Sequence, residues 1–189
     1  FRLTDEEAAR FALERYRFPG VEVNARLFRY YPYGEVGSHL IGYIGRINQS
    51  EKEDLEESAN ADAYRGTTHI GKLGVELGYE EVLHGIAGSE QMETTASGTV
   101  VRRLANKPAT PGKNVVLSID IKLQKMAEDL FGNRRGALVA VDPRNGDILA
   151  MVSKPTFDPN LFVDGIDAES WRTLNESINT LLLARAFRG

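Results

Sequence analysis

The chain has 189 residues, of which 42% are hydrophobic and 26% are charged, and its net charge is −4. This composition is typical of a globular protein, and the acidic balance predicts no binding to nucleic acid. The absence of cysteine excludes disulfides, Cys-ligated zinc and a thiol nucleophile. No run of about 18 apolar residues occurs, so we expect no membrane-spanning segment within these residues.

The first half of the chain predicts short helices, an extended segment and a hairpin. Thr4–Glu7 is a capping box at the start of a helix that ends at Pro19 and Gly20. Alternating apolar residues predict an extended segment, and Gly, Pro and polar clusters mark the turns between the later elements. The further predictions are an extended segment over Val21–Tyr31, a turn at Tyr31–Gly34, a short helix and turn over Leu40–Ile47, a solvated helix or loop over Ser50–Ala61, one helix over Gly71–Gly85, and a hairpin over Gln91–Leu104.

The second half begins at a segment rich in proline, Lys107–Lys113, which is the best candidate for a domain boundary. A strand over Asn114–Ser118 and a helix over Asp120–Phe131 are predicted to follow. The helix carries an apolar side formed by Leu123, Met126, Ala127, Leu130 and Phe131. A short helix is predicted over Ala168–Asn175.

Two apolar runs, Ala137–Val141 and Ile148–Val152, flank a Pro-Arg-Asn-Gly turn. Neither run alternates apolar with polar residues, so each is expected to be covered on both faces. An isolated hairpin is marginal in water, and a stable sheet needs more strands. We therefore expect this hairpin to belong to a larger sheet whose other strands lie elsewhere, or to pair with a second copy through its unpaired edges.

Several sequence blocks together resemble the class B penicillin-binding proteins, and among them the elongation-specific peptidoglycan D,D-transpeptidases of the penicillin-binding protein 2 type. The blocks occur in the family's order: Tyr16–Val23 (YRFPGVEV), Tyr31–Gly34 with His39 and Gly42-Tyr43, Gly71–Gly85, Val116–Gln124 (VLSIDIKLQ), Ala137–Asn160 and Asn179–Gly189. At the end of the chain Leu181 and Ala184 stand where the family has Pro and Asn, so the last block aligns less well.

The resemblance implies an α+β fold with two parts. An elongated, non-catalytic pedestal domain of the dimerisation type would cover residues 1–111. The first strands and helix of an incomplete αβα transpeptidase domain would cover residues 112–189. The Ala137–Val152 hairpin would supply the first two strands of that domain's sheet.

The family's reaction is acyl transfer by a serine that a lysine one helical turn away activates, in Ser-x-x-Lys. No Ser-x-x-Lys and no Lys-Thr-Gly occurs in this chain. The resemblance places the nucleophile beyond Gly189, so we expect no catalytic residue in this chain and no acylation by a labelled penicillin. We also expect no cofactor and no metal, since His39, His69 and His84 have no metal-ligand spacing.

An aromatic stretch offers the candidate partner surface. Arg26, Phe28, Arg29 and Tyr30 combine tyrosine and arginine, which interfaces favour, although the same aromatics are also compatible with a subdomain core. The resemblance implies an MreC-like rod-shape protein and a SEDS glycosyltransferase as partners, and stem peptides as substrates of the full-length protein only. It implies the periplasmic face of the bacterial inner membrane as the location.

Two alternatives remain open. The chain resembles the same region of a division-specific class B transpeptidase more weakly. It could also be a stand-alone α+β binding module, in which case the Ala137–Val152 hairpin would be paired on both edges within the chain.

Overall fold

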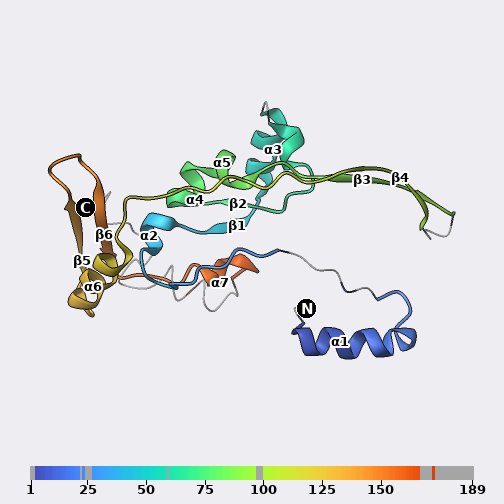
Figure 1. The fold of residues 1–189 in the computed structure, drawn as a ribbon, viewed down its shortest axis with the longest axis horizontal. Coiled ribbons are helices and arrows are strands. Elements are labelled where there is room, and N and C mark those ends of the chain that lie inside the picture. The colour runs from blue at the N-terminus through green and yellow to red at the C-terminus, as the bar shows by residue number, and fades with distance from the viewer. Residues whose placement is uncertain are drawn as a thin grey trace.

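The computed structural model describes residues 3–21, 23, 27–58, 60–96, 100–166 and 172. The fold is α+β, as predicted, and the molecule is elongated. Figure 1 shows helix α1 and the β3–β4 ribbon projecting at one end, with the β5–β6 hairpin and helix α6 at the other. No helix in the described part of the chain has the length and apolarity needed to cross a bilayer.

Helix α1 (Asp5–Glu14) and the 3₁₀ turn η1 (Arg15–Arg17) form the N-terminal arm. The predicted capping box is confirmed, because the Glu7 N–H donates to Thr4 Oγ1 at 3.3 Å and the Thr4 N–H donates to the Glu7 carboxylate at 2.8 Å. These bonds satisfy backbone donors that a helix start otherwise leaves open. The helix buries none of its residues, so it lacks the tertiary packing that usually stabilises a short helix.

A compact body follows the arm. Its elements are α2 (Ser38–Ile41), β1 (Ile44–Arg46), α3 (Gln49–Glu57), η2 (Ala61–Tyr64), β2 (His69–Gly71), α4 (Gly74–Gly78) and α5 (Glu80–His84). Strands β1 and β2 pair antiparallel. Helix α3 has no buried residue, which confirms the predicted solvated helix.

The prediction of one helix over Gly71–Gly85 is wrong. Gly71 lies in β2, and Tyr79, with φ −118° and ψ 22°, separates α4 from α5. The glycines allow close backbone contact: a Cβ at Gly71 would lie 2.1 Å from the Glu76 carbonyl oxygen, and a Cβ at Gly74 would lie 2.2 Å from that of Leu40. Tertiary packing therefore overrides the local helical pattern.

The predicted hairpin around residue 97 is confirmed as β3 (Ser89–Thr94) and β4 (Val100–Lys107), an antiparallel ribbon with two register shifts. The chain then returns to the body rather than running free. Thr110 exchanges both backbone hydrogen bonds with Ile86 at 2.9 Å, and the Lys113 N–H donates to the Val82 carbonyl. The strand predicted over Asn114–Ser118 is wrong, since no strand forms there.

The last described part contains α6 (Ile121–Phe131), β5 (Gly136–Val141), β6 (Ile148–Lys154) and α7 (Asn160–Val163). Strands β5 and β6 form the predicted hairpin, and among the described residues no third strand joins it. The outer edge of β6 is covered: the Ser118 hydroxyl donates to the Ile148 carbonyl, and the Asp120 N–H donates to the Leu149 carbonyl. This open, two-stranded arrangement does not fit the stand-alone module.

The predicted apolar side of α6 is only partly buried. Met126 and Leu130 are exposed, whereas Gln124, Ala127 and Glu128 are buried. The helix therefore turns a largely polar side toward the rest of the chain. Its buried polar side chains Gln124 and Glu128 form hydrogen bonds with the backbone of Met151 and Gly37, which lie far away in sequence.

The apolar core lies at the junction between the body and the segment after β6. Phe157 and Phe162 are buried and pack against Tyr43 and Leu73. The Tyr43 and Phe162 rings stack with centroids 4.0 Å apart, and Phe157 meets both rings edge-on. The segment that follows the hairpin is therefore held by residues of the body. The predicted helix over Ala168–Asn175 and the closing block Asn179–Gly189 lie outside the described residues, apart from Arg172.

Candidate partner-binding site

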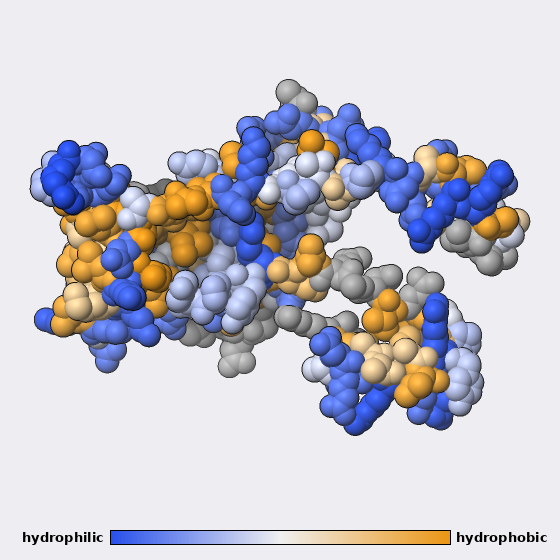
Figure 2. Space-filling model, in the orientation of Figure 1, coloured by the Kyte–Doolittle hydropathy of each residue, from blue (hydrophilic) through white to orange (hydrophobic). Residues whose placement is uncertain are grey.

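A cavity of about 1840 Å³ lies between helix α1 and the body of the pedestal. We call it the pedestal cleft. One wall comes from the arm, with Leu3, Ala8, Phe11, Val23 and Phe28. The other comes from the body, with Ile47, Leu55, Tyr64, Arg65, Thr67 and His69. Figure 2 shows α1 standing apart from the body, with apolar residues on its surface.

The lining of the pedestal cleft combines apolar residues with charges of both signs. The charged residues include Arg46 and Lys52 as well as Asp62 and Asp164. No group of three or more potential metal ligands occurs in the part of the chain that the structure describes. A cleft of this kind can accept an apolar segment of another chain with charged residues at its margin.

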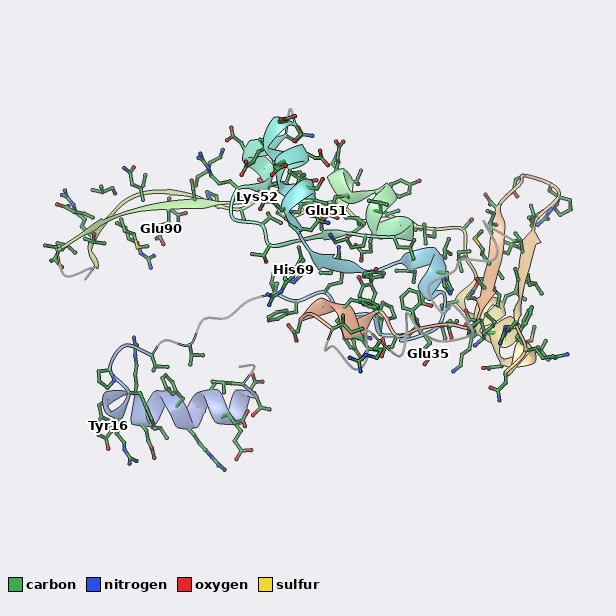
Figure 3. The ribbon with its side chains drawn as sticks, turned by 180° about the vertical axis from the view of Figure 1, so that it is seen from behind. Tyr16, Glu35, Glu51, Lys52, His69 and Glu90 are labelled. Carbon is green, nitrogen blue, oxygen red and sulfur yellow. The ribbon has the colours of Figure 1, made fainter. Side chains whose placement is uncertain are left out.

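His69 lies in the wall of this cleft, at the start of β2 (Figure 3). Its Nδ1 is 2.8 Å from the Thr68 hydroxyl, and its Nε2 is buried without a hydrogen-bond partner. Burial lowers the pKa of His69, and the positive charges of Arg46 and Lys72 lower it further, against the opposing charge of Asp164. The neutral imidazole is therefore favoured.

Three of the four residues predicted as a partner surface are described by the structure, and they lie in different surroundings. Phe28 lines the pedestal cleft and is 44% exposed, while Tyr30 is 74% exposed and does not line it. Arg29 is held by an ion pair with Glu76. Arg26 lies outside the described residues. Among the described members of the predicted set, Phe28 is the one that lines the cleft.

The neighbours of Phe28 are fixed by a buried polar cluster. The Arg29 guanidinium contacts both carboxylate oxygens of Glu76, at 2.9 and 3.0 Å. The Tyr31 hydroxyl donates to Glu76 at 3.1 Å and accepts from the Ile44 N–H at 3.1 Å. Burial and the negative charge of Glu76 raise the pKa of Tyr31. Tyr31 is therefore a core residue, and the cluster anchors the chain on both sides of Tyr30.

Local sequence patterns do not predict most of the cleft. Phe11 lies on α1, an amphipathic helix that buries none of its residues, and that pattern is the signal that could have marked it as a contact residue. Arg65, Thr67 and His69 lie in the wall only because the body folds toward the arm, and no motif links them to Phe28.

Two family models match the chain. The "Penicillin-binding Protein dimerisation domain" matches residues 2–117, and the "Penicillin binding protein transpeptidase domain" matches residues 136–183. The curated relatives include the peptidoglycan D,D-transpeptidase MrdA of Escherichia coli K12, which is 46% identical over 187 residues. That match covers 99% of this chain and 30% of the relative, so the chain spans under a third of that protein.

Two solved structures of penicillin-binding protein 2 (PBP2) from Helicobacter pylori are similar. The PBP2 in a complex with MreC matches 98% of this chain at 29% identity, with a TM-score of 0.81, and the match covers 34% of that chain. The other PBP2 structure matches 82% of this chain at 31% identity, with a TM-score of 0.63, and the match covers 29% of that chain. With the dimerisation-domain model matching more than half of its residues, this chain belongs to the penicillin-binding proteins, and its similarity is to those of the PBP2 type.

Proposed function

We propose that this chain is the non-catalytic pedestal and the start of the transpeptidase domain of an elongation-type peptidoglycan D,D-transpeptidase, and that its pedestal cleft binds an MreC-like rod-shape protein. The pedestal comprises residues 1–111 and the transpeptidase part residues 112–189. The pairing of Thr110 with Ile86 supports keeping the segment up to residue 111 with the pedestal. The family's catalytic motifs Ser-x-x-Lys and Lys-Thr-Gly do not occur in these 189 residues.

One observation carries the partner assignment. The structure resembles the PBP2 from the MreC complex over 98% of the chain, but resembles the other PBP2 structure over only 82%, with TM-scores of 0.81 and 0.63. Both structures are PBP2 from the same organism, and their identities to this chain are nearly equal. Taken as a whole, the chain is therefore more similar to the PBP2 in the complex with MreC.

The pedestal cleft has the features that a helical or extended apolar partner segment requires. Phe11 from the arm and Phe28 from the connecting segment both line it, and aromatic side chains supply much of the binding energy of interfaces. The charged residues at its margin, Arg46 and Lys52 among them, can select the partner's charge pattern.

The wider role follows from the same assignment. The parent protein joins peptidoglycan stem peptides by acyl transfer, and this chain supplies the scaffold on which that domain is mounted. It acts on the periplasmic face of the bacterial inner membrane and couples to a SEDS glycosyltransferase as well as to MreC. The similarity to MrdA supports the peptidoglycan role.

Calorimetric titration with the periplasmic domain of an MreC-like protein tests the assignment. We expect saturable binding that Phe28→Ala weakens about fivefold or more, since truncation of an interface aromatic costs on the order of 1–3 kcal/mol. Leu104→Ala is the matched control, because Leu104 is 50% exposed on the β3–β4 ribbon and does not line the cleft. Absence of binding at high micromolar concentration would refute the partner, and equal effects of the two variants would refute the cleft.

A further inference from the structure

A buried chain of hydrogen bonds joins the pedestal to the start of the transpeptidase domain. The Gly37 N–H donates to Glu128 Oε1 at 2.8 Å. The same oxygen accepts from Gln124 Nε2 at 2.7 Å. Gln124 then donates to the Met151 carbonyl at 2.8 Å and accepts from the Met151 N–H at 2.7 Å. The chain of bonds therefore runs from the turn before α2, through α6, to strand β6.

Every side chain in this path is withdrawn from water, since Gln124 is 1% exposed and Glu128 is 5% exposed. A buried carboxylate is costly unless it is hydrogen-bonded, and among the described residues Glu128 has no ion-pair partner. The bonds from Gly37 and Gln124 offset that cost. Because one of them comes from the pedestal, Glu128 is satisfied only when the pedestal turn sits on α6.

The same pedestal turn makes further contacts with the segment after β6. The Thr156 hydroxyl donates to the Glu35 carboxylate at 2.9 Å, and His39 Nε2–H donates to the Pro155 carbonyl at 3.0 Å. The Phe157 N–H donates to the Ser38 hydroxyl at 3.4 Å. Polar contacts of this kind are directional, so together they favour one orientation of the two parts over others.

We infer that Glu128 is a positioning residue that fixes the orientation of the pedestal on the transpeptidase domain, so that the two parts move as one rigid unit. The segment between the two parts, Lys107–Lys113, then does not act as a hinge, although its proline content is typical of a linker. This inference does not rest on the proposed partner, because none of these residues lines the pedestal cleft.

The variant Glu128→Gln tests whether residue 128 acts as a hydrogen-bond acceptor or through its negative charge. Glu128→Gln keeps an oxygen that can accept from both Gly37 and Gln124, whereas Glu128→Ala removes the acceptor. The chain has no cysteine, so spin labels can be placed cleanly at Asp54→Cys on α3 and Lys125→Cys on α6, both exposed positions.

The test is the distribution of distances between these two labels, measured by pulsed electron spin resonance in the 189-residue chain. We expect one narrow distribution in the parent chain and in Glu128→Gln, and a distribution at least about twofold broader in Glu128→Ala. A merely local role would destabilise α6 without broadening the distance between the two parts. An unchanged narrow distribution in Glu128→Ala would overturn the inference, and so would broadening in Glu128→Gln equal to that in Glu128→Ala.

If Glu128→Ala does not fold by circular dichroism, Glu128→Asp decides the question. This variant keeps the charge but shortens the side chain by one methylene, which withdraws the carboxylate from the Gly37 N–H. Broadening is expected again, and a narrow distribution would contradict the inference. In either folded variant, hydrogen exchange at the Gly37 amide is expected to speed up about tenfold or more, and unchanged exchange would also count against it.

Discussion

The side chain of Asn160 pairs with the backbone of Tyr31 as a neighbouring strand would. The Tyr31 N–H donates to Asn160 Oδ1 at 3.0 Å, and Asn160 Nδ2 donates to the Tyr31 carbonyl at 3.0 Å. Asp158 accepts from the same amide nitrogen at 2.8 Å and so orients it. This pairing joins α7 to the segment beside the pedestal cleft, although the two residues are 129 positions apart in sequence.

Asn160→Ala is expected to lower the free energy of unfolding by about 1–3 kcal/mol, because it leaves the N–H and C=O of Tyr31 without their partners. Urea unfolding measures this change. Asn114→Ala is the matched control, since Asn114 is exposed in the extended segment before α6, and it should stay within about 0.5 kcal/mol. Similar losses in both variants would show that the pairing contributes nothing specific.

Arg29→Met should destabilise the chain through Glu76, whose side chain is only 6% exposed. Without the guanidinium, the buried carboxylate keeps the hydrogen bond from the Tyr31 hydroxyl but loses its ion pair, and we expect a loss of about 1–3 kcal/mol in urea unfolding. Arg29→Lys should recover only part of it, because an ammonium cannot form the two-pronged contact.

Arg144→Met is the control for that experiment. Arg144 also contacts both oxygens of its partner, Asp142, but its side chain is 87% exposed, so solvent weakens the pair and the variant should be nearly neutral. If Arg144→Met proved as costly as Arg29→Met, burial of Glu76 would not be the cause of the loss.

Local signals predicted the elements that local chemistry determines. The capping box at Thr4 and the turn between β5 and β6 depend on residues a few positions apart, and both form as predicted. The single helix over Gly71–Gly85 failed because Gly71 and Gly74 pack against the backbones of Glu76 and Leu40, and no periodicity encodes that contact.

Helix α6 shows the same limit for burial. Its apolar residues Met126 and Leu130 are exposed, and its polar residues Gln124 and Glu128 are buried. Apolar periodicity indicates which side could be covered, but the partners that bury the polar side are backbone groups of residues far away in sequence. The pedestal cleft was unpredictable for the same reason, since its two walls come from separate parts of the chain.

Stability should depend on pH through His69, whose pKa is lowered by burial and by the positive charges of Arg46 and Lys72. In the unfolded chain His69 takes up a proton near pH 6.5, whereas in the folded chain it does so only at a lower pH. The contribution of the neutral ring to the free energy of unfolding is therefore fully present above pH 6.5 and is lost as the pH falls through the lowered pKa. Urea unfolding of the parent chain should therefore weaken more between pH 7.5 and 5.5 than that of His69→Gln.

An NMR titration of the His69 ring provides the independent check. Its midpoint should fall below 6.5, the ordinary value for histidine. A midpoint at or above that value, or equal pH dependence of unfolding in the parent chain and in His69→Gln, would contradict the prediction. The comparison with the variant removes contributions from other titrating groups.

The outer edge of β5 is where a second copy of the chain is expected to pair. The outer edge of β6 is occupied by Ser118, Asp120 and Gln124, whereas no described residue pairs along β5, whose Val139 is 46% exposed. An open apolar strand edge promotes association, and a lysine on it opposes association by its charge.

Sedimentation velocity should show dimers whose proportion rises with concentration. Val139→Lys should suppress these dimers. Val116→Lys is the control and should leave them unchanged, because Val116 is 92% exposed and lies outside the sheet. A monomer at every concentration, or equal suppression by both lysines, would exclude pairing through β5.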